Sequence, residues 1–123
     1  MNLIDSSAWL AYFNGEKNRV HFREPIKDFI HLIVPTIVIY EVFKRMLATC
    51  GSDSALEASA HLQRARVIPL TDHLAILAAK ISREEKLGMA DSIILATART
   101  YSATIWTQDA DFKGVAGVKY FKK

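Results

Sequence analysis

The sequence predicts an α/β protein with three layers: a central, mostly parallel sheet of four or five strands, flanked by helices on both faces. Short apolar segments alternate with longer segments of helical periodicity along almost the whole chain. The short segments lack a strict polar–apolar alternation, as expected for strands that are buried on both faces. No repeat and no linker rich in Pro, Gly or Ser interrupts the 123 residues, which predicts one domain over residues 1–123.

Strands are expected at the short apolar segments, which cover residues 2–4, 31–34, 66–70, 103–109 and 118–121. Helices are expected at the periodic segments between them, which cover residues 7–13, 23–30, 37–50, 52–65, 71–88 and 89–102. Thr36 is a candidate cap for the third helix, and Gly51 and Gly88 are expected to end the helices that precede them.

Composition limits the cellular setting and the classes of partner. Sixteen Lys and Arg residues against 13 Asp and Glu give a net charge of +3, which weakly favours a polyanionic partner. No apolar run approaches the roughly 20 residues that span a bilayer, and the start MNLIDSS lacks the pattern of a signal peptide. We therefore expect a cytoplasmic protein with no membrane partner. One cysteine, Cys50, excludes an internal disulfide and a cysteine-built metal site.

Acidic residues stand at positions where a core-building sequence would place apolar ones. Asp5 follows the first strand, Glu41 interrupts the apolar run IVIYEVF, and Asp91 opens a helix in GMADSIILATA. Asp109 and Asp111 follow the fourth strand in WTQDADF. Buried carboxylates are uncommon unless they are paired or bound to a metal. Ligands bind at the carboxyl ends of parallel strands, so we expect the acids that follow strands to share one edge of the sheet.

Each acid also has an ordinary structural explanation. Asp5 can cap a helix, Asp91 can complement a helix dipole, and Glu41 can pair with Arg45 one turn later. The last two acids can be turn residues. Their coincidence at one edge favours a shared site for Mg²⁺ or Mn²⁺, as one or two ions, because hard cations choose oxygen ligands. Such a site suits phosphodiester hydrolysis.

Four segments, LIDSSAWLAYF, VPTIVIYEVFKR, GMADSIILATA and WTQDADF, resemble in this order the PIN-domain ribonucleases. The resemblance covers essentially the whole chain and is strongest to the VapC-type toxins of toxin–antitoxin pairs. It implies a PIN-like fold and a hydrolase, a Mg²⁺- or Mn²⁺-dependent endoribonuclease with a water nucleophile. It also implies a homodimer and a cognate antitoxin protein whose tail blocks the site.

The resemblance assigns roles to residues. The family's four acids, the candidate catalytic residues, fall on Asp5, Glu41, Asp91 and Asp109. Asp5, Asp91 and Asp109 are the expected metal ligands, with Glu41 and Asp111 as further candidates. Ser6 and Thr107 are expected either to donate hydrogen bonds to the ligands or to be ordinary polar residues at strand ends.

Basic residues near these segments are candidates for binding RNA phosphates. They are Lys44, Arg45, Arg99 and Lys113, with Lys119, Lys122 and Lys123 near the carboxyl end. Arg45 ranks first because it lies one helical turn beyond Glu41 on the same face. The aromatic residues Trp9, Tyr12 and Phe13 could stack on bases, but their helical spacing is more typical of a core or a dimer interface, and we favour the interface.

Two other functions remain open at this point. A receiver-like phosphoacceptor domain is also a small parallel-sheet protein with acids that bind Mg²⁺, but it needs an acidic pair after the first strand. A non-catalytic RNA-binding module would use the basic surface, but four carboxylates that repel phosphates would have no role in it.

Overall fold

The computed structural model describes all 123 residues and contains a five-stranded sheet in which every strand pairing is parallel. The strands are β1 (Asn2–Ile4), β2 (Leu32–Pro35), β3 (Arg66–Ile68), β4 (Thr104–Thr107) and β5 (Val118–Tyr120), in the spatial order β3-β2-β1-β4-β5. The predicted fold class is therefore confirmed.

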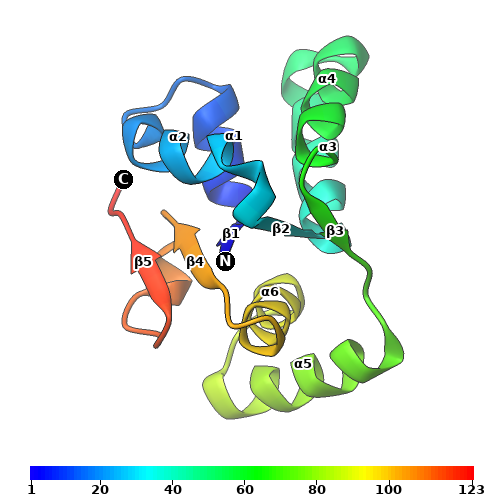
Figure 1. The fold of residues 1–123 in the computed structure, drawn as a ribbon, viewed down its shortest axis with the longest axis vertical. Coiled ribbons are helices and arrows are strands. Elements are labelled where there is room, and N and C mark those ends of the chain that lie inside the picture. Colours follow the sequence, from blue (N-terminus) through cyan, green and yellow to red (C-terminus); the bar gives the residue numbers. More distant parts are fainter.

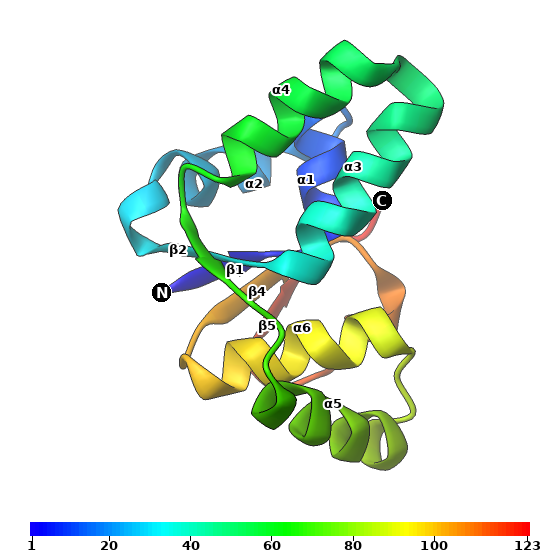
Figure 2. The same ribbon diagram turned by 90° about the vertical axis from the view of Figure 1, so that its right-hand side faces the viewer.

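The helices form two outer layers on the sheet. They are α1 (Ser6–Phe13), α2 (Arg19–Lys27), α3 (Thr36–Cys50), α4 (Ser52–Leu62), α5 (Asp72–Glu85) and α6 (Met89–Thr100), with 3₁₀ turns η1 (Phe29–His31) and η2 (Ala110–Phe112). Helices α1 to α4 cover one face of the sheet, and α5 and α6 cover the other (Figure 2). They pack as neighbouring pairs, α1 with α2, α3 with α4 and α5 with α6 (Figure 1). No helix is long and apolar enough to cross a membrane.

The central strands are buried on both faces. Adjacent residues Leu3 and Ile4 of β1 are both fully buried, and so are Ile33 and Val34 of β2. A side chain that points to either face of the sheet meets a helical layer, so both must be apolar. This burial explains why the strand segments lack polar–apolar alternation.

Most element boundaries differ from the sequence prediction by a few residues, and three differences bear on helix ends. The second helix covers Arg19–Lys27 in place of 23–30, and Phe29–His31 forms a 3₁₀ turn. Thr36 is the first residue of α3 and does not cap it, because Pro35 occupies the cap position. Gly88 precedes α6 as its N-cap, whereas α5 ends at Glu85 and is capped by Lys86, which has a left-handed backbone.

Strand order determines which loops meet. β1 lies between β2 and β4, so the residues that follow these three strands emerge side by side at the carboxyl edge of the sheet. α1 begins there after β1, α3 begins there after β2, and η2 begins there after β4. This arrangement brings together segments that are as much as a hundred residues apart in sequence.

Candidate active site

Asp5 is an N-cap and a buried acid at once. Its Oδ1 accepts hydrogen bonds from the backbone N–H of Ala8 at 2.9 Å and from the Ser7 hydroxyl at 2.7 Å. Its Oδ2 accepts one from the Thr107 hydroxyl at 2.5 Å. Only 2% of Asp5 is exposed, and this burial raises its pKa to about 6, although the three hydrogen bonds act to lower it. The position after β1 thus holds a carboxylate in a fixed orientation.

Glu41 reaches the same edge from α3. Its side chain is half-buried, and Oε1 accepts a hydrogen bond from the Ser6 hydroxyl at 2.9 Å. Burial raises the pKa of Glu41, the bond from Ser6 lowers it, and the negative charge of Asp109 raises it again. Glu41 and Asp109 therefore lie within electrostatic reach of each other.

Asp91 lies in the first turn of α6, where the helix dipole favours a negative charge. Burial nevertheless raises its pKa to about 7. The other four carboxylates contribute to this rise through repulsion, in the order Asp109, Asp5, Glu41 and Asp111. The charge of each of the other four acids thus raises the pKa of Asp91, and the five carboxylates form one electrostatic cluster.

Three of the five acids are close enough to share a cation. Carboxylate oxygens of Asp91, Asp109 and Asp111 all lie within 4.8 Å of one another. Asp109 caps η2, accepts the backbone N–H of Asp111 at 2.9 Å, and donates its own N–H to the Thr107 hydroxyl at 2.9 Å. A donor set made only of carboxylate oxygens suits a hard divalent cation. A cation held there would also relieve the repulsion on Asp91, so the residues present fit Mg²⁺ or Mn²⁺.

The composition of this close group differs from the ligand order expected from the sequence. It includes Asp111, which was only a further candidate, and it leaves out Asp5, which was expected among the nearest ligands. The reason is local: three chain donors hold the Asp5 carboxylate against α1 and β4, whereas the η2 turn brings Asp111 back beside Asp109.

Sequence reasoning missed Ser7 and Gln108. Ser7 donates to Asp5, and its hydroxyl accepts the backbone N–H of Gln108 at 3.3 Å. Buried Asn18 donates to the Gln108 side-chain oxygen at 3.1 Å and to the carbonyls of Phe121 and Lys122. These bonds hold the carboxyl terminus beside the start of α2 (Figure 1). The only signal in the sequence was that Ser7 is the second Ser of LIDSS and directly follows Ser6, which was the predicted hydrogen-bond donor.

Several basic residues border the acidic cluster. Lys44 and Arg45 line a hollow of about 300 Å³ together with Glu41 and Tyr40. Lys122 and Lys123 line a second hollow, of about 480 Å³, with Asp109. Both hollows adjoin candidate acids, so positive charge lies beside the cluster both on α3 and at the carboxyl end of the chain.

The other basic candidates have different surroundings. Arg99 lies in the last turn of α6, at the opposite end from Asp91, and pairs with Glu85 at 3.0 Å. The Lys119 amine stands 4.3 Å from the centre of the Trp106 ring. Lys113 is exposed immediately after η2. Of these three residues, only Lys113 is both close in sequence to the cluster and free of such a contact.

The interpretation of Trp9 as a dimer-interface residue is wrong. Trp9 is fully buried, because α1 lies beneath α2 and α4 and places the indole among other rings. It stacks on Phe13 with ring centres 5.6 Å apart and contacts the His61 ring edge-on at 5.7 Å. Tyr12 and Phe13 are partly buried in the same cluster.

Solved structures of similar fold come from toxin–antitoxin systems. A toxin–antitoxin complex from Klebsiella pneumoniae matches with a TM-score of 0.85 and 22% identity over 100% of both chains. VapC20 of Mycobacterium tuberculosis, described as a sarcin–ricin loop cleaving toxin, matches with a TM-score of 0.78 and 19% identity over 94% of this chain and 95% of that one. DNA-bound VapBC from Salmonella typhimurium matches with a TM-score of 0.71 and 16% identity over 99% and 98%.

These identities are low, so the structural likeness establishes the fold alone. No curated protein sequence matches the chain significantly. The PIN domain family model, however, matches residues 3–118 and thus spans all five acids of the cluster. With nearly the whole sequence inside that match, the chain belongs to the PIN-domain family.

Proposed function

We propose that this protein is a metal-dependent endoribonuclease that acts as the toxin of a toxin–antitoxin pair. The observation that carries the proposal is the acidic cluster, in which Asp91, Asp109 and Asp111 bring oxygens within 4.8 Å of one another. A cluster of this kind is costly without a cation, because like charges raise each other's pKa. The family match leaves the receiver-like phosphoacceptor without support.

Asp91, Asp109 and Asp111 would hold the ion, with Asp5 beside them. When bound, Mg²⁺ or Mn²⁺ makes a water molecule more acidic and neutralises the charge of the scissile phosphate. The chain contributes orientation: Thr107, Ser7 and the Ala8 N–H fix the Asp5 carboxylate.

We infer that Glu41 orients the attacking water and takes its proton. Its pKa is raised by burial, which brings it closer to the working pH, as general-base catalysis requires. The hydroxyl of Ser6 holds one carboxylate oxygen, and the other is available for the water. Lys44 and Arg45, next to Glu41 on α3, would hold the RNA backbone.

The role as a toxin is supported by the structural neighbours, which come from toxin–antitoxin complexes. We infer that a cognate antitoxin covers the acidic edge and that the protein forms a homodimer. The ribosomal target named for VapC20 belongs to that protein; for this chain we propose only that the substrate is RNA.

The test is cleavage of a 5′-labelled structured RNA by the purified protein with Mg²⁺ or Mn²⁺, with and without EDTA. We expect internal cleavage that EDTA abolishes and that Asp109→Asn reduces by at least about a hundredfold, since each tenfold corresponds to roughly 1.4 kcal/mol of transition-state stabilisation. The matched control is Asp72→Asn, which removes an exposed acid at the start of α5 and should cleave like the wild type.

Binding of RNA without cleavage under any metal would favour the non-catalytic RNA-binding module and contradict the proposal. The toxin role is tested separately by expression in cells: growth should stop with the wild type and continue with Asp109→Asn. Normal growth at high levels of active nuclease would overturn the toxin role and leave the nuclease standing.

A further inference from the structure

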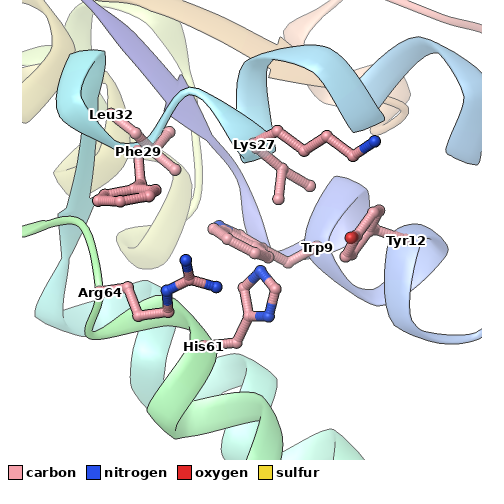
Figure 3. Close-up of a pocket in the computed structure, with 8 residues that line it drawn as sticks. Trp9, Tyr12, Lys27, Phe29, Leu32, His61 and Arg64 are labelled. Atoms are coloured by element: carbon pink, nitrogen blue, oxygen red, sulfur yellow. The ribbon is translucent and has the colours of Figure 1, made fainter.

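A pocket of about 250 Å³ lies on the helical layer formed by α1, α2 and α4, away from the acidic cluster. Its apolar wall is built mainly by the rings of Trp9, Tyr12 and Phe29 (Figure 3). Lys27 stands at its rim at the end of α2, and Arg64 stands there in the turn just after α4. No acidic residue lines it, so the pocket combines aromatic walls with positive charge only.

The basic groups of the pocket have no anionic partner in the chain. The protein contains one ion pair of an Arg, Arg99 with Glu85, and a contact of the His31 ring with Asp28 at 3.0 Å, and neither involves the pocket. The Arg64 guanidinium lies over the Phe29 ring at 4.8 Å, a contact that orients it and leaves its N–H donors unused.

A buried donor also lacks a partner. The indole Nε1 of fully buried Trp9 is the one buried side-chain nitrogen or oxygen atom without a hydrogen bond. Figure 3 shows this nitrogen on the side of the ring that faces Phe29 and Arg64. Leaving such a donor unsatisfied costs free energy, and an acceptor placed in the pocket would remove that cost.

The His61 ring completes the polar part of the pocket. Burial, together with the positive charge of Arg64, lowers the pKa of His61. At neutral pH the ring is therefore uncharged. It packs edge-on or tilted against the rings of Trp9, Tyr12 and Phe13, with centre distances of 5.6 to 5.9 Å, and can still offer a nitrogen to a ligand.

We propose that this pocket binds a small organic anion, with a flat apolar body against the aromatic wall and a carboxylate held by the Trp9 indole N–H and Arg64. The two donors supply what a carboxylate requires, since each of its oxygens can accept a charge-assisted hydrogen bond. The cavity is smaller than the roughly 300–1,000 Å³ of pockets for drug-sized ligands, which favours a ligand the size of a single ring. The inference does not depend on the proposed nuclease function.

The test uses the two indoles of the chain as probes. Trp9 has an unbonded indole N–H, whereas Trp106 Nε1 already donates to Asn2 Oδ1 at 2.9 Å. In ¹H–¹⁵N correlation spectra of the intact protein, titration with benzoate should shift the Trp9 indole peak downfield and leave the Trp106 peak in place. The spectrum of Trp106→Phe assigns the two peaks.

Matched variants separate charge from shape. Arg64→Gln should weaken benzoate binding about tenfold, the loss expected for one charge-assisted interaction. Arg66→Gln removes an exposed guanidinium two residues later, which lies over the Tyr101 ring, and should bind benzoate like the wild type. Thermal melts establish that both variants are folded.

Three results would overturn the proposal. A Trp9 peak that does not respond to benzoate at millimolar concentration would show that the pocket takes no such anion. An equal response to benzyl alcohol, unaffected by Arg64→Gln, would show an apolar pocket. A response to a capped aspartyl-phenylalanine dipeptide but not to benzoate would assign the pocket to a segment of a partner protein.

Discussion

Thr107 links two of the acidic segments through one hydroxyl. It donates to Asp5 Oδ2 and accepts the backbone N–H of Asp109. The residue is fully buried at the end of β4, so the hydroxyl has no access to water. The relative positions of the first and the fourth acid therefore depend in part on this buried side chain, which acts together with the β1–β4 pairing and the Ser7 hydroxyl.

Replacing Thr107 with Val keeps the shape and removes this link. We expect Thr107→Val to lower the free energy of unfolding by about 1–3 kcal/mol, because it leaves a buried carboxylate with an unsatisfied oxygen. Chemical denaturation at neutral pH measures the change. The control is Thr104→Val at the start of the same strand, whose side chain makes no hydrogen bond within the chain; equal losses for the two variants would contradict the prediction.

The acidic cluster makes stability without metal depend on pH in a definite direction. The native pKa of Asp5 is about 6 and that of Asp91 about 7, both above the ordinary value of 3.8. Between pH 3.8 and these native values, the folded protein therefore binds more protons than the unfolded chain. The protonated acids stabilise the fold fully below pH 3.8, and this contribution is lost as the pH rises through 6 and 7. The native pKa of His61 is lowered, so the folded protein binds fewer protons at this site than the unfolded chain, and the contribution of His61 to stability rises with pH.

Asp91→Asn isolates the carboxylate contribution. In EDTA, the variant and the wild type should melt at similar temperatures only near about pH 3.5, below the unfolded pKa, and the variant should melt increasingly higher up to about pH 8, where the repulsion is fully developed. Melting curves across this range, with Asp72→Asn as the control, measure the difference. An Asp91→Asn variant that is less stable than the wild type at the higher pH would be incompatible with the repulsive cluster.

At the scale of single residues, the sequence predicted which residues carry the chemistry, but it did not predict most of the contacts that these residues make. Asp5 and Asp91 stood out because they follow or open apolar segments. Ser7 and Gln108 did not stand out, because polar residues at strand ends are common and only the folded chain shows which of them meet. The pairing of Asp111 with Asp109 depends on the η2 turn, which has no distinct sequence signal.

At the scale of elements, the junction of α3 and α4 depends on Gly51. Its backbone φ of +91° lies in a region that other residues rarely adopt, and no atom lies within 4 Å of where a Cβ would stand. Gly51→Ala should therefore destabilise the fold through backbone strain alone, by roughly 1–3 kcal/mol. Gly88→Ala, at an ordinary φ of −66°, is the matched control, and thermal denaturation should show the smaller loss there.

All five strands and six helices were predicted, and the errors lie at their ends. The helix of Arg19–Lys27 was placed four residues too late at its start, at residue 23. In the structure Pro25 lies near the end of the helix, where only one backbone bond is lost. Asn18 occupies the N-cap position of this helix but does not cap it with its side chain, because that side chain donates to Gln108 and to the carbonyls of Phe121 and Lys122. Such tertiary bonds override local signals.

At the scale of the whole molecule, positive charge lies on both sides of an acidic edge. We expect RNA binding in Ca²⁺, a cation used in place of Mg²⁺ to prevent cleavage, to weaken with salt. The double variant Lys44→Gln, Arg45→Gln should reduce the slope of log affinity against log salt by about 0.7 for each lost phosphate contact. Lys80→Gln, on the opposite helical layer, is the control. If the double variant, like the control, leaves the slope unchanged, Lys44 and Arg45 of α3 do not contact the RNA backbone.

The convergence of the acids was predictable because a parallel sheet places the carboxyl ends of its strands at one edge. The anion pocket was not predictable, since it needs the packing of α1 against α2 and α4, which no local pattern specifies. Trp9 shows the difficulty: its helical spacing fits a core, an interface and a base-stacking surface equally well.

The chain has a natural division at the connection between β3 and α5, residues 69–71. The segment before it supplies β1, β2 and β3, which are neighbours in the sheet, and the segment after it supplies β4 and β5. The earlier part also brings Asp5 and Glu41, and the later part brings Asp91, Asp109 and Asp111. A protein cut there would yield two fragments whose parts of the sheet join at one strand pair, β1 against β4, while α1 and α3 of the first also contact β4 and α6 of the second. Neither fragment would hold all five acids until the two joined. Activity would then report reassembly, as in a complementation assay.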